Sequence, residues 1–326
     1  MHSWQPTATI ETLRARAGIL KKIHDFFYER GVLQVETPLL SHATVSDPYI
    51  DSMEVYFKKI GSLQETICYL QTSPEYAMKR LLAAESGAIY QVTKSFRQGE
   101  VGQLHNPEFT MLEWYRLDYD HHQLMDEMAE LLCLIFNINS IDRMSYRHIF
   151  LKYLNTDPLI SDCRELINCA KENNLQLNTY DSQKEENNKN FWLDVLFSHC
   201  IEPQLGLEKP IFIFDFPAAK AALAKIRDET PPVASRFEVY FKGIELANGF
   251  HELQDAKEQL RRFENDLMLR KQYQLRKVPI DQHLIAALTK GLPDCAGVAL
   301  GIDRLVLLAL GKKSIKEVIS FSFEVA

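Results

Sequence analysis

The sequence predicts an α+β protein in which helices flank an antiparallel sheet, because strand-like segments follow one another through short loops with helical segments interspersed. Residues 88–97 and 109–117 have the pattern of two antiparallel neighbours. Residues 236–250 have the pattern of two more strands that turn near Lys242 and Gly243. The chain contains neither a GxGxxG motif nor a P-loop motif, so a bound nucleotide would need another kind of cradle.

Helical segments are indicated by apolar side chains that recur every three or four residues. The first of them stops at Gly31, a residue type that favours helix C-termini, and Pro74 suits the first turn of the second. The expected helices are residues 11–30, 76–86, 122–136, 254–273 and the second half of 297–311. The remaining expected strands are residues 210–217, the first half of 297–311 and a segment that begins at residue 32 and ends at Pro38.

The composition is that of a globular protein, and the length allows one large core or two modest ones. The chain has 326 residues, of which 46% are hydrophobic and 25% charged. We expect a single domain over residues 1–326, because no linker rich in Pro, Gly or Ser divides it. Residues 155–190 contain KENN and QKEENNKN, which predict a solvated, variable insertion.

Charge and targeting signals restrict the possible partners. No apolar run is long enough to span a membrane and the N-terminus has no signal core, so we expect a cytoplasmic protein without a membrane partner. The six cysteines form no CxxC pair, a pattern typical of reduced thiols rather than of a zinc site. The formal net charge of -7 gives no electrostatic reason to expect a nucleic-acid partner.

Glu113 is the unusual residue of the strand-like segment that follows residue 108. In an extended chain its side chain shares a face with Phe109, Met111 and Tyr115. A carboxylate buried there would need a cation, a donor or water beside it. The alternation is equally compatible with an edge strand that exposes Glu113 to solvent.

Three segments, FRQGE with HNPEFTMLEWY, VETP, and GIDRL, resemble the three signature motifs of class II aminoacyl-tRNA synthetases. The resemblance extends from about residue 11 to residue 320 and is greatest to the catalytic domain of lysyl-tRNA synthetases. It implies that family's antiparallel sheet flanked by helices. The stretches YFKGIELANGFHEL and GLPDCAGVALGIDRL resemble free-standing paralogues of these enzymes, which attach β-lysine to a lysine of elongation factor P. Because the chain starts at the catalytic motifs, we expect no anticodon-binding domain and no tRNA partner.

The resemblance implies ATP and Mg²⁺ as cofactors and identifies residues for each. Arg97 and Arg304 are the implied catalytic residues: Arg97 holds the α-phosphate, while Arg304 and Phe109 enclose the adenine. The other implied ATP-binding residues are Gln98, Gly99, Glu100, Asn106, Glu245, Leu246 and Gly301.

Glu238 and Glu245 are the implied magnesium ligands. Seven residues apart, they would point to opposite faces of one straight strand, so the turn near Lys242 and Gly243 is required to bring them together.

The amino-acid substrate is implied to be held by two groups of residues. Glu113 and Tyr115, with Glu252, match the pocket for the distal ammonium of lysine. In the second group, Glu75 matches the site near the amino group and carboxylate of the substrate, and the other implied substrate-binding residues are Ser73, Pro74, Asn248 and Ala299.

Two departures from the family pattern concern the site. Gly99 stands where the family often has a carboxylate, and Glu100 can replace it only if the loop shifts. Ala299 stands where the tRNA enzymes tend to have glycine, but one methyl group is worth only about 1 kcal/mol of discrimination. The choice between β-lysine and α-lysine therefore stays open at this stage.

The leading hypothesis is an ATP-dependent ligase that activates (R)-β-lysine and transfers it to elongation factor P. The alternatives are a truncated lysyl-tRNA synthetase that charges tRNA and a catalytically silent amino-acid-binding module. The family dimerises through its first motif, so we predict a homodimer formed by the first helix and the strand after it. The hypothesis also predicts that the two arginines and the acidic residues surround one cavity.

Overall fold

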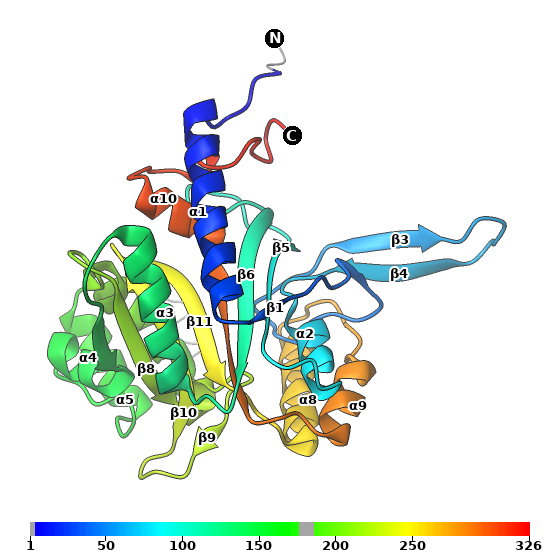
Figure 1. Cartoon of the computed structure of the whole chain (residues 1–326). Helices are drawn as coiled ribbons and strands as arrows, with labels where there is room; N and C mark the ends of the chain where they lie inside the picture. Colours follow the sequence, from blue (N-terminus) through cyan, green and yellow to red (C-terminus); the bar gives the residue numbers. More distant parts are fainter. Residues whose placement is uncertain (1–3, 176–185) are drawn as a thin grey trace. The chain divides into compact units, whose positions relative to one another are not determined.

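The computed structural model describes residues 4–175 and 186–326, which divide into two compact units (Figure 1). Unit 1 comprises Met1–Tyr119 and Leu253–Ala326, and unit 2 comprises Asp120–Glu252. The α+β class is confirmed, since each unit combines a largely antiparallel sheet with helices. That the whole chain is a single domain remains a prediction.

The sheet of unit 1 has the strand order β1 (Leu33–Gln34), β5 (Ile89–Phe96), β6 (Glu108–Leu117), β12 (Cys295–Gly301). The predicted antiparallel pair is β5 and β6, and β12 joins β6 from the far end of the chain, also antiparallel. The edge strand β1 runs parallel to β5, so the sheet is mixed at that edge.

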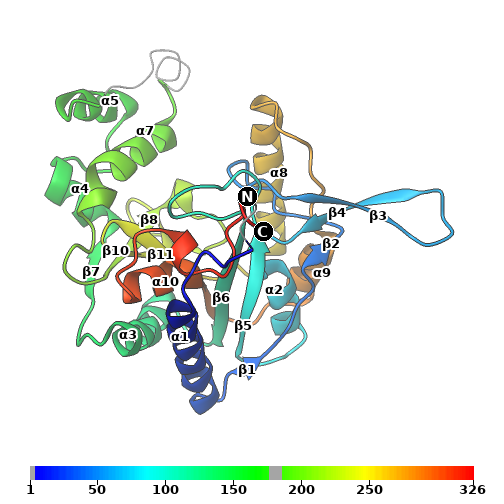
Figure 2. The same ribbon diagram turned by 90° about the horizontal axis from the view of Figure 1, so that it is seen from above.

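One face of this sheet is covered by helix α1 (Ile10–Glu29), as Figure 2 shows from above. The Phe27 ring of α1 stacks on Tyr90 of β5 at 4.5 Å between centroids and lies 5.2 Å from Trp114 of β6. The helix ends before Gly31, whose φ of +63° is accessible to glycine at little cost. The sheet face that includes Tyr90 and Trp114 is therefore the core face.

The strand expected from residue 32 to Pro38 is much shorter than predicted. Only Leu33–Gln34 is strand there, and the last backbone hydrogen bond to β5 is from Val35 N to the Tyr90 carbonyl at 2.9 Å, three residues before Pro38. The chain then forms a second, three-stranded sheet of β2 (Leu40–Ser41), β4 (Glu65–Leu70) and β3 (Glu54–Lys58). The long β3–β4 hairpin is prominent in Figure 1.

The remaining elements of unit 1 are helical. Helix α2 packs against α9, which also contacts α8, and α10 begins directly after β12. Their bounds are α2 Glu75–Ala83, α8 Ala256–Gln272, α9 Gln282–Lys290, α10 Ile302–Ala309 and the 3₁₀ turn η4 Ile315–Glu317.

Unit 2 has a sheet of order β11-β10-β8-β7, with β9 paired to β10. The β10–β11 and β8–β10 pairs are antiparallel, and β7 and β8 are parallel. The strands are β7 Asp142–Ser145, β8 Ile211–Pro217, β9 Ile226–Arg227, β10 Val233–Phe241 and β11 Ile244–His251. The helices are α3 His121–Phe136, α4 Tyr146–Leu154, α5 Cys163–Glu172, α7 Lys189–Leu196, η1 Phe197–Ile201, η2 Glu202–Gln204 and η3 Ala218–Lys220.

Helices cover both faces of the unit 2 sheet. Helix α3 packs on one face, where its Phe136 ring meets Phe241 of β10. Helices α4, α5 and α7 and the π-helix η1 share a buried cluster with Ile213 of β8 and Tyr240 of β10 on the other face. Helix α5 falls in the expected insertion at residues 155–190, yet it contributes buried side chains to this core; residues 176–185 of that stretch lie outside the described part.

Searched over the described residues, the structure contains no helix that is both long and apolar enough to cross a membrane.

Gly206 is the position at which the fold most clearly needs glycine. Its φ is +64°, and a Cβ atom there would lie 2.5 Å from the Tyr240 carbonyl oxygen. The same segment accepts backbone hydrogen bonds from Lys242 and Gly243, the turn of the β10–β11 hairpin, at 2.8 Å each. Gly206 therefore allows the backbone to support that turn.

We predict that Gly206→Ala lowers the free energy of unfolding by about 2–4 kcal/mol, from left-handed backbone strain and overpacking together. Gly87→Ala is the matched control, because Gly87 has a φ of +76° but a Cβ atom added there would meet no other atom within 4 Å. It should lose only the strain, about 1 kcal/mol. Equal losses in denaturant titrations of the two variants would contradict the proposed clash.

Candidate active site

The unit 1 sheet presents a polar face opposite the one that α1 covers. Across three strands, Gln91 of β5, Glu113 of β6 and Ala299 of β12 are register partners in one row. Two residues along, Gly301 pairs with Met111. Alternation puts these side chains on one face, with the small residues of β12 leaving space beside Glu113.

Glu113 is buried, which decides between the two interpretations of its strand. Strand β6 has neighbours on both sides, and Glu113 is only 2% exposed, so the interpretation as a solvent-facing edge strand is wrong. The Tyr115 hydroxyl donates to Glu113 Oε1 at 2.6 Å, and both groups are buried. The structure thus joins the two residues predicted to bind a distal ammonium.

The two arginines predicted to be catalytic lie near the same loop. The Arg97 guanidinium is 5.1 Å from the centroid of the Phe109 ring, and Arg304 Nη2 lies 2.6 Å from His105 Nε2. Burial first, and then the charges of Arg304 and Arg97, lower the pKa of His105, while Glu100 opposes them. His105 therefore favours its neutral form, which can accept a hydrogen bond from Arg304.

Arg97 retains hydrogen-bonding capacity. Its Nε is buried and has no hydrogen-bond partner among residues 4–175 and 186–326, and its distance to Glu100 is a loose 3.7 Å. Gly99, with a φ of +81°, bends the chain between them, and Gln98 N donates to the Asp51 carbonyl. The loop thus brings Glu100 to Arg97.

Asn106 has a structural role in the loop. Its amide donates to the Glu108 carbonyl at 2.7 Å and accepts from Phe323 N at 3.0 Å. These bonds fix the turn into β6 just before Phe109. A contact between Asn106 and ATP remains a prediction.

Glu75 is held by a residue that was not predicted from the sequence. Pro74 precedes helix α2, whose second turn carries Lys79, and Lys79 Nζ lies 2.7 Å from Glu75 Oε1. Lys79 is 1% exposed, so a buried cation fixes this carboxylate beside Ser73 and Pro74. The i,i+4 spacing on one helix was the signal that could have revealed the pair.

The β10–β11 hairpin brings Glu238 and Glu245 to one face. The turn is formed by Lys242 and Gly243, with φ values of +52° and +70°, so Glu245 pairs with Tyr240. Glu238 and Tyr240 are two residues apart on β10 and share that face. The predicted turn is confirmed, and it has the predicted effect.

A β-bulge adds Asn248 to this face. The register changes after Val239, so Leu246 is the extra residue of β11, and Asn248 pairs with Glu238. Without the extra residue, Asn248 would face the opposite side. Leu246 itself is buried, and a role in ATP binding remains a prediction.

Arg236 links the two predicted functions of this hairpin and was not predicted from the sequence. Its guanidinium donates to Asn248 Oδ1 at 3.2 Å, to the Lys220 carbonyl at 2.7 Å and to Glu238 Oε1. Glu238 Oε2 accepts from the Tyr240 hydroxyl at 2.6 Å. Burial, followed by Glu238 and Glu245, raises the pKa of Tyr240 well above its usual value, so it stays a donor.

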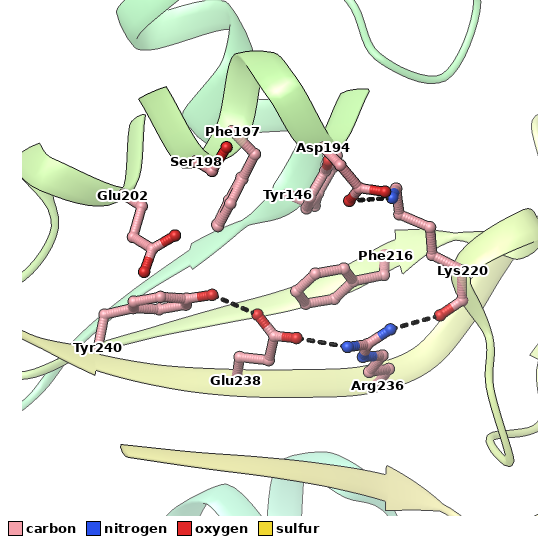
Figure 3. Close-up of a pocket in the computed structure, with 10 residues that line it drawn as sticks. All are labelled: Tyr146, Asp194, Phe197, Ser198, Glu202, Phe216, Lys220, Arg236, Glu238 and Tyr240. Atoms are coloured by element: carbon pink, nitrogen blue, oxygen red, sulfur yellow. Dashed lines mark hydrogen bonds and ion pairs between the residues drawn. The ribbon is translucent and has the colours of Figure 1, made fainter. Parts of the chain in front are cut away.

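Beside Glu238 is a cavity of about 240 Å³, drawn in Figure 3. Its upper side comes from α4, α7 and the helical turns after it, and its lower side from β8 and β10. Lys220 pairs with Asp194 at one end, while Glu202 lies at the other end with its carboxylate directed toward Tyr240. The lining residues are Tyr146, Asp194, Phe197, Ser198, Glu202, Phe216, Lys220, Arg236, Glu238 and Tyr240.

One further cluster has metal-ligand chemistry among the described residues: His121, His122 and Asp215, whose ligand atoms lie within 4.8 Å of one another. However, Arg227 Nη2 is 2.8 Å from Asp215 Oδ1. Burial opposes ionisation of Asp215, but hydrogen bonds from His121 and Arg227 outweigh it and lower its pKa. The guanidinium cation already balances this carboxylate, which disfavours a metal ion there.

The structure therefore assembles two partial sites. Unit 1 contains Ser73, Pro74, Glu75, Glu113, Tyr115, Ala299 and the arginine loop; unit 2 contains Glu238, Glu245, Asn248 and the buried Glu252. That all of them surround one cavity stays a prediction.

Asp303 is another residue that was not predicted from the sequence. It precedes Arg304, is 4% exposed, and accepts a hydrogen bond from Thr110 N at 2.9 Å. Arg16 Nη2 of α1 lies 2.6 Å from Asp303 Oδ1, so the two side chains form an ion pair. The contact does not have the geometry of a hydrogen bond. Asp303 thus ties the start of α10 to β6 and α1.

The chain is similar over nearly its whole length to one family model and to three proteins that share one name. The family model described as "tRNA synthetases class II (D, K and N)" matches residues 3–324. A Vibrio cholerae protein named "Elongation factor P--(R)-beta-lysine ligase" is 53% identical over 320 residues, 98% of each chain. Proteins of the same name from Vibrio vulnificus and Yersinia enterocolitica are 52% and 51% identical, over 99% and 98% of this chain and 99% and 97% of their own lengths.

We predict that Asp303→Asn lowers the free energy of unfolding by about 3–5 kcal/mol, because it leaves the largely buried Arg16 without its counter-charge. The control is Asp25→Asn on helix α1, which also carries Arg16. It breaks an exposed ion pair with Lys21 and should change the free energy of unfolding by less than about 0.5 kcal/mol. Denaturant titration measures both. Similar small losses would show that Asp303 does not hold α10 in place.

Proposed function

We propose, because the chain belongs to the family of class II tRNA synthetases (D, K and N), that it is an ATP-dependent ligase for (R)-β-lysine. The acceptor is a lysine side chain of elongation factor P. The observation that carries the proposal is the identity of more than half over nearly the full length with relatives named for this reaction. The acceptor is a translation factor, so we expect the reaction in the cytoplasm.

The first half-reaction joins the amino acid to AMP. A carboxylate oxygen of the amino acid attacks the α-phosphorus of ATP, the P–O bond to the β-phosphate breaks, and pyrophosphate leaves. Two anions must approach each other, so a cation is needed beside the α-phosphate. Arg97 supplies it, and its buried, unpartnered Nε among the described residues has a donor for a phosphoryl oxygen.

Phe109 and Arg304 position the nucleotide. An adenine ring can stack on the Phe109 face, and a guanidinium can cover the other side of a flat base while keeping its charge. His105 and Asp303 hold the arginine and its helix in place before ATP arrives. Such preorganisation reduces the rearrangement needed to reach the transition state.

The second half-reaction forms an amide. The acceptor ε-amine, after losing a proton to solvent, attacks the carbonyl carbon of the adenylate; the C–O bond to AMP breaks, AMP leaves, and the nitrogen releases its second proton. No side chain of the enzyme becomes covalently attached. Positioning and charge neutralisation are the contributions of the chain.

Glu238 and Glu245 suit a magnesium ion by donor type and placement. Both are carboxylates on one face of the β10–β11 hairpin, and hard cations prefer oxygen ligands. Each Glu238 oxygen accepts one hydrogen bond, from Arg236 or Tyr240, and keeps a second lone pair. Arg236 and Tyr240 would orient the ligand. Magnesium, when bound, neutralises phosphate charge.

The amino-acid end groups are assigned to separate residues. Glu113, with Tyr115, receives the distal ammonium, and Glu75, fixed by Lys79, receives the amino group near the reacting carboxylate. Asn248 keeps its amide N–H₂ for the substrate, because Arg236 occupies its carbonyl oxygen. A ligand without the distal charge would forgo the attraction to the Glu113 carboxylate.

The decisive assay incubates the full chain with ATP, Mg²⁺, one lysine isomer and either elongation factor P or tRNA. We expect the mass of elongation factor P to rise by one β-lysyl group, and chelation of Mg²⁺ to stop the reaction. Arg97→Ala should lower pyrophosphate exchange by about 10²–10³-fold. The melting temperature should change little, because the variant loses a loose ion pair to Glu100 and the contact with Phe109 but also removes a buried N–H that has no partner among the described residues.

The controls separate the alternatives. An acceptor whose modified lysine is replaced by arginine should remain unlabelled. Label on tRNA alone would support a tRNA synthetase instead, and absence of pyrophosphate exchange with every lysine isomer would support a silent binding module.

We also propose a homodimer formed through α1 and β1. Tyr28 of α1 and Leu33 of β1 are exposed apolar side chains, which favour a partner surface. Light scattering at micromolar concentration should give the dimer mass, and Leu33→Glu should shift it toward the monomer. Leu63→Glu, at an equally apolar but separate exposed position, is the control. A wild-type monomer would refute the proposal.

A further inference from the structure

Gln91 stands in the same row of the unit 1 sheet as Glu113. It is the register partner of Glu113 on β5, and Ala299 is the partner on β12. Cβ atoms of directly opposed residues in antiparallel strands are about 4.5–5.5 Å apart, so the Gln91 side chain starts next to that of Glu113. On the other side, Ala299 offers only a methyl group.

The Gln91 amide is buried without being satisfied. Its side chain is 3% exposed, and Oε1 has no hydrogen-bond partner within the part of the chain that the structure describes. Buried carbonyl oxygens are nearly always paired, because losing water without gaining a donor is unfavourable. Gln71 is a buried glutamine whose amide does have a partner: its Nε2 donates to the Lys94 carbonyl at 2.8 Å.

We propose that Gln91 is a specificity-determining residue whose Oε1 accepts a hydrogen bond from the distal ammonium of the amino acid, beside Glu113. This inference rests on the proposed function. An ammonium carries three donors, and Glu113 Oε1 already accepts from the Tyr115 hydroxyl. A second acceptor from the neighbouring strand therefore adds to the shell around the cation.

The neutral amide suits this position better than a second acid. It adds an acceptor without placing a second carboxylate beside Glu113, whose repulsion would destabilise the chain when no cation is bound. A ligand of equal length that ends in a hydroxyl group has one donor and no charge, so it cannot satisfy both Gln91 and Glu113. The site would thus select a primary ammonium at the end of an aliphatic chain.

The test compares two ligands on two variants of the full chain. Direct binding is measured by calorimetry for the lysine isomer that supports pyrophosphate exchange and for its analogue with a terminal hydroxyl group. Gln91→Met keeps the size and removes the acceptor. In Gln91→Met we expect the dissociation constant of the lysine isomer, the amine ligand, to rise about 10–100-fold. That of the hydroxyl analogue should change less than about 3-fold.

Stability and charge provide independent readouts. The melting temperature of Gln91→Met should stay equal or rise, because an unsatisfied buried acceptor is removed. Gln91→Glu keeps an acceptor and adds a charge, so the preference for the amine over the analogue should increase in this variant and decrease in Gln91→Met. Gln91→Glu decides the question if Gln91→Met does not fold.

Gln71→Met is the matched control, since it removes a buried amide that has a partner. It should lower the melting temperature and leave the ratio of the two dissociation constants unchanged. An unchanged ratio in both Gln91 variants, with wild-type exchange intact, overturns the role of Gln91 alone. A wild-type chain that binds no lysine isomer overturns the proposed function and this role with it.

Discussion

The register of the strands determines which polar side chains share a face, and every proposed role depends on it. In unit 1, a slip of one residue between β5 and β6 would exchange Glu113 with Trp114. The stacking of Phe27 on Tyr90 and its contact with Trp114 oppose that slip, because both aromatic side chains must face α1. The apolar packing on one face therefore fixes the polar arrangement on the other.

The same constraint operates in unit 2, where two local irregularities set the register. The turn at Lys242 and Gly243 pairs Glu245 with Tyr240, and the extra residue Leu246 brings Asn248 opposite Glu238. Backbone hydrogen bonds from the turn to the segment around Gly206 hold the hairpin end. Arg236 then joins Glu238 and Asn248 through one rigid guanidinium, which a more flexible cation could not do with the same geometry.

Much of this arrangement could be predicted from local patterns, but not all. The helix that ends before Gly31, the β5–β6 pair and the hairpin turn have short-range signals. The burial of Glu113 does not, because it depends on β12, which is remote in the sequence. The parallel edge strands were missed because each pairs with a segment that is distant in the sequence, and the end of β1 at Gln34 likewise depends on where its pairing with β5 stops. Asp303 acquires its role only when Arg16, which is remote in the sequence, is beside it. Arg236 contacts Asn248 because the extra residue Leu246 brings Asn248 to its face of the hairpin.

Glu238 differs from Arg97 and Gln91 in how far its polar atoms are paired. In unit 2, Glu238 has donors on both oxygens, whereas in unit 1 Arg97 retains a buried N–H, and Gln91 a buried carbonyl, without a partner among the described residues. Unsatisfied polar groups reduce stability, so a ligand that satisfies these two groups would stabilise the fold. An anion beside Arg97 and a cation beside Gln91 and Glu113 would do so together. A diamino acid joined through its carboxyl group to a nucleotide phosphate carries both charges: the anion on the phosphate and the cation on the distal ammonium.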